Sequence, residues 1–413
     1  MGIKEIVRGF LLADVQTATS STVVKSPLGE SVKSLTTNPI LKKIGANEYI
    51  KFGTNDDIPE VLEALKGKSS THAGIISKKS KMVAGEKLDY GGKRTSQNGS
   101  KNIEWTVFRD NAGGYNITLD TVFREMAFIY EEQGAVGLVV TKEGVNLVKL
   151  EAVTPRKLRA AAPENGVVTK WVKRDVFKNT SSRVFSNEEE LINVYTIDNK
   201  DDRQIIYIAN PESDNDFYGL PNYIGAFNFI EADYEFGVTI KNSAENGFSP
   251  KVLATFIGRN VSEDQKTSQA NKFKNNFQGS DREQVILSWV RRKEDTPEFK
   301  SLDISGLDKT IDVMARLNDS KILTAHSVTN PTLFGVTIAG KLGNSGTELE
   351  SAYNIFRATE TLPTRELLLD GLRTAFKGSQ FDDIELTVID PSVSADELRG
   401  GDTTDTEDTT KKE

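Results

Sequence analysis

Apolar residues recur along the first half of the chain with two periods, one typical of helices and one typical of strands. Residues 56–66, 70–84 and 118–132 carry apolar side chains three or four positions apart, which predicts amphipathic helices. Residues 135–150 contain two apolar runs that meet at residues 142–144, which predicts a β-hairpin, and further strand-like runs follow. We therefore expect an α+β region built on a mostly antiparallel sheet.

Two longer amphipathic helices are predicted in the second half of the chain. The first begins at Pro221, because proline is favoured in a first helical turn, and it ends before Gly247. The second covers about residues 307–325. A first helix of some 25 residues is long for a globular domain of this type, so we expect it to span a subunit. Their apolar stripes consist of Ile224, Phe227, Ile230, Tyr234 and Val238 in the first helix and of Leu307, Ile311, Met314, Leu317 and Leu323 in the second.

A small α/β module is predicted between the two long helices, at residues 259–306. Ser262 and Gln265 match a capping box that starts a helix. Residues 251–258 and 283–290 are strand-like runs that precede and follow this helix. The module therefore has its own secondary structure and interrupts the pair of long helices.

The glycine-rich stretch FGVTIAGKLGNSG, at residues 334–346, nearly matches a phosphate-binding loop. Gly335, Gly340 and Lys341 have the spacing of that motif, but Leu342 stands where Ser or Thr would hold Mg²⁺. We therefore expect a mobile loop rather than a nucleotide site. A helix is predicted directly after it, with Ser345 and Glu348 as a capping box and with a kink or a break at Pro363, and a final strand is expected at residues 381–390.

The composition narrows the candidate chemistry. The 413 residues include no cysteine and only two histidines, His72 and His326, which excludes thiol catalysis and His-rich metal sites. We expect His72 to be solvated or to cap its helix, with no second ligand nearby, and His326 to lie at a helix end or to serve in packing. Neighbouring carboxylates such as Asp56-Asp57 are expected in turns or at helix starts. We therefore predict no enzyme activity, no cofactor and no metal site.

The charge of the chain bears on its partners. A formal net charge of −8 disfavours firm binding to nucleic-acid phosphates, although it does not exclude DNA as a partner. Basic residues gather at residues 156–178, including Arg159, and we expect them on a solvated sheet face, with a partner surface as the alternative. No stretch approaches about 18 uncharged apolar residues, and charged residues interrupt the N-terminal apolar segment. We expect an unexported protein without a membrane anchor.

The order of these elements resembles that of the portal proteins of tailed bacteriophages. YGLPNYIG, a long helix and then NGFSP are similar to that family's turn, long helix and N-G-x-x-P exit. The segment AHSVTNPTLFGV looks like its I-A-x-x-x-x-V-P-x-x-L-x-G signature, with Asn330-Pro331 where the family often has Val-Pro. The resemblance covers roughly residues 69–390, and the order of the motifs carries it.

The resemblance implies an α+β subunit with a named division of the chain. The parts are an N-terminal arm and wing (1–220), a first stem helix with the following strand (221–258), a clip (259–306), a second stem helix (307–330), a tunnel loop with a kinked helix (331–380), and a closing strand with a disordered acidic tail (381–413). Only a short segment would remain for the crown of longer relatives.

The resemblance also implies functional residues. The DNA-facing tunnel loop would contain Gly340, Lys341, Gly343, Asn344, Ser345 and Gly346. An acidic side of the first stem helix, with Glu231, Asp233 and Glu235, would repel DNA from the channel wall if it faces the channel. The clip surface, which would dock the terminase and later the head–tail adaptor, would include Lys272, Lys274, Arg291 and Arg292.

The implied function is that of a non-enzymatic homo-oligomeric ring of about twelve subunits at one capsid vertex. Double-stranded DNA would pass through this ring during packaging and ejection. The expected partners are the terminase large subunit, the major capsid protein and the head–tail adaptor, with no membrane, and the expected locations are the virion and, during assembly, the host cytoplasm. The alternative is another virion-assembly or adaptor component, and an enzyme with a degenerate phosphate-binding loop is the third possibility.

Overall fold

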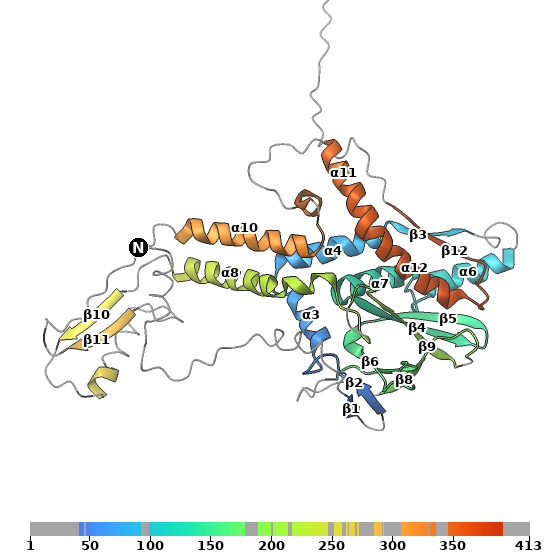
Figure 1. Cartoon of the computed structure of the whole chain (residues 1–413), viewed down its shortest axis with the longest axis horizontal. Coiled ribbons are helices and arrows are strands. Elements are labelled where there is room, and N and C mark those ends of the chain that lie inside the picture. Colours follow the sequence, from blue (N-terminus) through green and yellow to red (C-terminus); the bar gives the residue numbers. More distant parts are fainter. Residues whose placement is uncertain are drawn as a thin grey trace, which may run out of the picture. The chain divides into compact units, whose positions relative to one another are not determined.

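The computed structural model places two compact units along the chain (Figure 1). Unit 1 comprises residues 1–64, 76–222 and 332–413, and unit 2 comprises residues 65–75 and 223–331. The structure describes residues 41–44, 47–91, 99–177, 189–199, 201–213, 217–246, 252–257, 262, 264–268, 271, 285–290, 292, 307–328, 330–335 and 346–390. The polar arm up to residue 40 and the acidic tail after residue 390 lie outside these residues.

A six-stranded sheet forms the centre of unit 1, in the strand order β5-β4-β9-β8-β7-β6. Every neighbouring pair is antiparallel except β8 and β9, which run parallel. The predicted α+β class and the mostly antiparallel sheet are therefore confirmed. The strands are β4 (Ala135–Glu143), β5 (Asn146–Val153), β6 (Leu158–Ala160), β7 (Lys170–Lys173), β8 (Glu190–Val194) and β9 (Arg203–Ala209).

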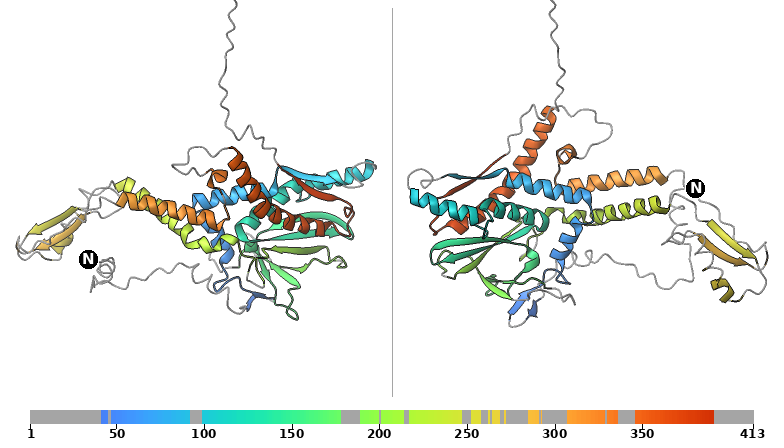
Figure 2. Two further views of the ribbon diagram at one scale, coloured as in Figure 1. Left: turned by 45° about the horizontal axis from the view of Figure 1, so that its top comes forward. Right: turned by 180° about the vertical axis from the view of Figure 1, so that it is seen from behind.

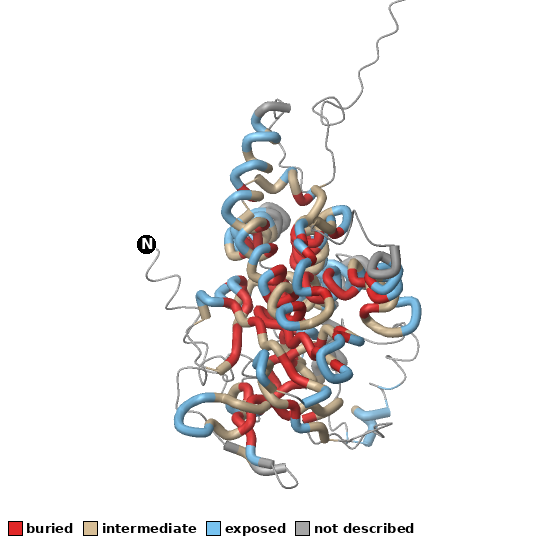
Figure 3. The backbone as a smooth tube through the Cα atoms, turned by 90° about the vertical axis from the view of Figure 1, so that its right-hand side faces the viewer, coloured by how far each residue is buried: buried red, intermediate tan, exposed pale blue. Residues whose placement is uncertain are grey.

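Helices α6 (Gly99–Asn111), α7 (Leu119–Gln133) and α12 (Leu362–Phe376) contact strands of this sheet (Figure 2). The predicted apolar face of α7 is buried there. Thr118 caps the start of α7 by accepting a hydrogen bond from the Thr121 N–H at 3.2 Å, and Gly134 ends it at a φ of 73°. Buried positions cluster together (Figure 3), and the aromatic residues buried in the core of the helices and the sheet are Trp105, Phe108, Phe123, Tyr130, Phe376 and Phe381.

A separate two-stranded sheet in unit 1 joins two strands that are far apart in the sequence. β3 (Lys87–Gly91) pairs antiparallel with β12 (Glu385–Ile389), so the predicted final strand is confirmed. Near the start of the described residues, β1 (Leu41–Ile44) pairs antiparallel with β2 (Asn47–Ile50). The Glu48 carbonyl accepts a hydrogen bond from the Ala162 N–H at 2.9 Å, which joins β2 to the chain that follows β6.

The C-terminal helix is divided, as predicted from Pro363. α11 (Gly346–Phe356) is followed by a π-helical segment, Arg357–Thr361, and then by α12, which has Pro363 in its first turn. Ion pairs hold the π-helical segment. Asp390 pairs with Arg357 and Arg365 at 2.5 Å each, and Glu360 lies 3.5 Å from Lys79.

Unit 2 contains the two long helices, α8 (Phe227–Asn246) and α10 (Leu307–Ala325). α10 matches its prediction, whereas residues 222–226 form a 3-10 helix, so that α8 begins later than Pro221. Between them, β10 (Val252–Ile257) and β11 (Val285–Val290) pair in parallel. The capping box is confirmed, because the Ser262 N–H donates to Gln265 Oε1 and the Gln265 N–H donates to Ser262 Oγ.

Helices α3 (Ile58–Lys66) and α4 (Ser70–Ala84) lie where predicted. Both cross the boundary between the units, because residues 65–75 belong to unit 2 and the rest of each helix belongs to unit 1. A short 3-10 helix, Pro331–Phe334, follows the end of unit 2.

Candidate functional site

Helices α8 and α10 pack side by side in unit 2 (Figure 1). Asn318, towards the end of α10, donates from Nδ2 to the carbonyl of Phe229, near the start of α8, at 2.9 Å. Tyr223, in the 3-10 helix directly before α8, also packs against His326, directly after α10. The two contacts together show that the helices run antiparallel. Ile230 and Ile322 are fully buried in the same region. The described packing of the pair is thus concentrated at the start of α8 and the end of α10.

One side of α10 leaves large apolar residues in contact with solvent. Val313, Met314 and Leu317 are 64%, 51% and 55% exposed, and their spacing places them on one side of the helix. We call these three residues the α10 stripe. On α8, Tyr234 and Ile240 are also exposed. The apolar stripe predicted for α10 is therefore divided: Leu323 is buried, whereas Met314 and Leu317 are not covered in a single chain.

The three acidic residues predicted on the first long helix have different surroundings. Glu231 accepts a hydrogen bond from Lys68 Nζ at 2.8 Å, so its charge is paired within unit 2. Glu235 is exposed and lies one turn from Glu231, whereas Asp233 falls on the opposite side of the helix. The structure therefore does not gather these carboxylates into one acidic face. That these residues would repel DNA from a channel wall stays a prediction.

Asp233 faces a second carboxylate. Burial raises the pKa of Asp319 on α10, and the negative charge of Asp233 adds to this rise. The Thr71 hydroxyl opposes it by donating to Asp319 Oδ1 at 3.0 Å. This hydrogen bond joins the start of α4 to α10.

Most residues that the resemblance assigns to the tunnel loop and the clip lie outside the described residues. Gly346 is the first residue of α11, and Arg292 is exposed. Their expected roles stay predictions, as does the capping box at Ser345. The predicted residues outside the described part are Gly340, Lys341, Gly343, Asn344, Ser345, Lys272, Lys274 and Arg291.

The two histidines of the chain meet inside unit 2, although 254 positions separate them. His72 Nδ1 and His326 Nε2 are 2.9 Å apart, and both side chains are buried. The Tyr223 ring packs against both imidazoles, with centroids 4.6 Å from His72 and 4.8 Å from His326. The expectation that His72 has no ligand-type neighbour is therefore wrong, while the packing role expected for His326 is confirmed.

His72 is neither solvated nor a helix cap. Ser69 caps α4 instead, because its Oγ accepts a hydrogen bond from the His72 N–H at 3.0 Å. Burial and, to a smaller extent, the nearby Lys66 cation together lower the pKa of His72 to about 4. The ring of His72 is therefore neutral in the folded protein at neutral pH.

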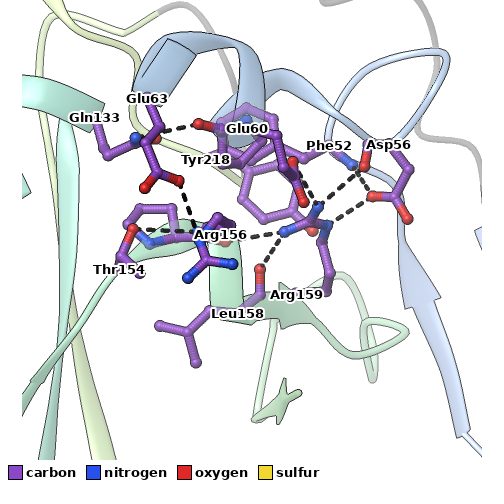
Figure 4. Close-up of polar contacts among 12 residues, drawn as sticks. Phe52, Asp56, Glu60, Glu63, Gln133, Thr154, Arg156, Leu158, Arg159 and Tyr218 are labelled. Carbon is purple, nitrogen blue, oxygen red and sulfur yellow. Dashed lines mark hydrogen bonds and ion pairs between the residues drawn. The ribbon is translucent and has the colours of Figure 1, made fainter. Parts of the chain in front are cut away.

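Unit 1 contains a buried ion-pair network that the sequence pattern did not predict (Figure 4). Arg159 is fully buried on β6, and its Nε donates to Asp56 Oδ1 at 2.6 Å. Its Nη1 donates to the carbonyls of Pro155 and Leu158, both at 2.9 Å, and Tyr49 donates to Asp56 Oδ2 at 2.8 Å. Burial raises the pKa of nearby Glu60, whose carboxylate lies 3.9 Å from Arg159.

One expectation is corrected by this network, because Arg159 does not lie on a solvated sheet face but is covered by the segment of Asp56. The expected position of Asp56 in a turn and of Asp57 at a helix start is confirmed. Asp56 is nevertheless only 1% exposed, and it adopts a φ of 58°. The network fastens the chain before α3 to β6, so its role is structural.

Among the described residues, no three or more His, Asp or Glu side chains gather as a metal-binding group. None of the helices that the structure describes is long and apolar enough to cross a membrane.

Comparisons with known proteins find similarity in fold. No family model and no curated protein matches the chain. A chain in the neck of the empty GTA particle, computed with C6 symmetry, is 12% identical, with a TM-score of 0.53 and coverage of 89% of this chain and 90% of that chain. A chain in the neck of the native GTA particle, computed with C12 symmetry, is 13% identical, with a TM-score of 0.53 and coverage of 90% and 92%.

A chain in the virion of the native gene transfer agent (GTA) particle is also similar. It is 13% identical, with a TM-score of 0.50 and coverage of 91% of this chain and 92% of that chain. At such identities the comparison shows a shared fold. The similarity nevertheless extends over nearly the whole length of both chains, so it includes both units and is not confined to one of them.

Proposed function

We propose that this chain is a portal subunit: a structural, non-enzymatic protein that forms a ring in a phage-like particle and gives passage to double-stranded DNA. The observation that carries the proposal is the fold shared over 90% of this chain with a neck chain of the native GTA particle. That neck was computed with C12 symmetry, which supports a ring of about twelve copies. The order of motifs in the sequence supports the same assignment.

The α10 stripe supports the ring. A neighbouring copy in a cyclic assembly makes a head-to-tail contact, in which one surface of each subunit covers a different surface of the next. The exposed Val313, Met314 and Leu317 provide apolar area for such a contact, and a row of large apolar residues on one helix side marks an interaction surface. We assign the stripe to this contact between copies.

The charge of the chain agrees with a channel for DNA. A net charge of −8 favours a surface over which DNA moves without being held, because tight phosphate contacts would slow its passage. The ATPase that drives packaging would be a separate protein. We place the terminase large subunit, the major capsid protein and the head–tail adaptor as partners, and the capsid vertex of the virion as the location.

Mass photometry and negative-stain microscopy of the full chain test this proposal. We expect the wild-type chain to form closed rings of about twelve subunits. Leu317→Asp should prevent or strongly reduce ring formation, because a carboxylate would be buried in the contact. The matched control is Val145→Asp, which changes a 71% exposed residue of the β4–β5 turn and should leave ring formation unchanged.

Two results would contradict the proposal. The first is a wild-type chain that stays monomeric or dimeric under all assembly conditions. The second is ring formation by Leu317→Asp that equals ring formation by Val145→Asp, because the α10 stripe would then have no part in the assembly.

A further inference from the structure

The buried pair of His72 and His326 joins three segments of unit 2. His72 lies in the first turn of α4, His326 directly follows α10, and Tyr223 lies in the 3-10 helix before α8. The chain contains no other histidine. The pair therefore connects the ends of two helices through the only side chains whose ordinary pKa falls near neutral pH.

The hydrogen bond between the rings requires one protonated and one unprotonated nitrogen. His72 Nδ1 and His326 Nε2 can share one proton at a separation of 2.9 Å. If both rings were fully protonated, two N–H groups and two positive charges would face each other, and neither nitrogen could accept the hydrogen bond. In addition, His72 Nε2 is buried and has no hydrogen-bond partner among the described residues, so a charged His72 would have an N–H without an acceptor there.

The charged groups around the pair do not offset such a charge. The Lys66 cation, at the end of α3, acts on His72 and disfavours its protonation. Lys68 and Glu231 neutralise each other at 2.8 Å, and Asp319 is engaged by the Thr71 hydroxyl at 3.0 Å. The charge of Asp233 acts on Asp319. No carboxylate of the described residues contributes to the shift of the His72 pKa, which burial and Lys66 cause.

We propose that the His72–His326 pair is an acid-sensitive latch that holds the start of α4 to the end of α10 while one of its rings is neutral and that opens when both rings are protonated. The latch is a property of unit 2 and does not depend on the proposed function. Opening would release the chain at the end of α10.

The direction of the pH effect follows from linkage. The pKa of His72 is lowered to about 4 in the folded state, and its ordinary value is about 6.5. Between pH 6.5 and pH 4, His72 is therefore mostly neutral in the closed state and mostly protonated in the open state. Opening should become more favourable by up to about tenfold for each pH unit below 6.5, and the change should level off near pH 4.

Hydrogen exchange of the full chain, followed by mass spectrometry from pH 7.5 to pH 4.5, tests the latch. Protection factors, corrected for the intrinsic rates, are compared between peptides at residues 69–75 and 318–328 and a reference peptide at residues 119–133 of unit 1. In the wild type, the first two should lose protection by about tenfold per pH unit below 6.5, and the reference should not. The double variant His72→Asn/His326→Gln, whose amides can form the hydrogen bond but cannot titrate, should lose this pH dependence.

The proposal is overturned if the wild type and the double variant show the same pH dependence at residues 69–75 and 318–328. A second measurement decides the question if the double variant fails to fold. Because the wild type has only two histidines, selective labelling of their ring carbons gives two signals in an NMR titration. Two rings that titrate independently near pH 6.5 would exclude the latch, and a pair of which one ring stays neutral well below that pH would support it.

Discussion

The two units of the chain are stabilised in different ways. Unit 1 encloses a large core between its sheet and its helices, and buried charges such as Arg159 and Asp56 fasten its outer segments. In unit 2, the buried apolar residues that the structure describes lie at one end of the helix pair, for example Ile230 and Ile322. The α10 stripe remains exposed, and a buried polar contact joins two histidines. Both units leave large apolar side chains exposed, for example Ile103 and Val107 on α6 in unit 1, but only unit 1 has a large enclosed core among the described residues, whereas the long helices of unit 2 offer apolar surface that a second copy can cover.

The largest expected effect on stability tests the buried ion pair of Arg159 and Asp56 in unit 1. Arg159→Ala should lower the free energy of unfolding by about 3–5 kcal/mol, because it leaves the buried Asp56 carboxylate without its partner. Chemical denaturation, followed by the fluorescence of the tryptophans, measures this change. The matched control is Arg156→Ala, because Arg156 pairs at 3.2 Å with the half-exposed Glu63 and should contribute less than about 1 kcal/mol. Equal losses in the two variants would show that the buried network does not fasten unit 1.

The next largest effect on stability distinguishes a buried position from an exposed position on α10. Ile322→Ala should destabilise the chain by about 2–5 kcal/mol, because it removes a fully buried side chain and leaves a cavity. Met314→Ala, on the same helix, should change the stability of the monomer by less than about 0.5 kcal/mol, because Met314 is 51% exposed. Denaturation at concentrations too low for assembly measures both. A large loss for Met314→Ala under these conditions would mean that the α10 stripe is packed within one chain.

Local patterns in the sequence predicted most of the elements. The helix at residues 70–84, the helix at residues 307–325 and the division at Pro363 follow from apolar spacing and from proline chemistry, and the structure has them in the same places. The capping box of Ser262 and Gln265 also depends on neighbours only. Short-range rules of this kind are sufficient for helices and strands because the determining contacts lie within a few residues.

The buried polar contacts could not be predicted in the same way. Arg159 and Asp56 are 103 positions apart, and His72 and His326 are 254 positions apart. No periodicity of a single sequence links residues at such separations, so each was assigned by its type alone, as a solvated base, a turn carboxylate or a lone histidine. The α10 stripe is an intermediate case, since its apolar character was visible but its exposure depends on what α8 covers.

The smallest expected effect compares the two units in acid. Burial alone would raise the pKa of Asp390 in unit 1, but hydrogen bonds from Arg365 and Arg357 outweigh it and lower this pKa below its ordinary value of about 3.8. Its stabilising effect is therefore fully present above about pH 4 and is lost as the pH falls through the lowered value. The His72 latch of unit 2 should open at higher pH, between about 6.5 and 4.

Hydrogen exchange at the π-helical segment, residues 357–361, measures the contribution of Asp390. Between pH 5 and pH 3, the wild type should lose protection there only below about pH 4, while Asp390→Asn should show the lower protection throughout and no further loss. Asp370→Asn is the control, because Asp370 is largely exposed and pairs only with Arg373 among the described contacts. If residues 357–361 lost protection at a higher pH than residues 318–328, unit 1 would be the more acid-sensitive of the two. The expected order, in which the His72–His326 pair opens at a higher pH than the ion pairs of Asp390 break, would then be wrong.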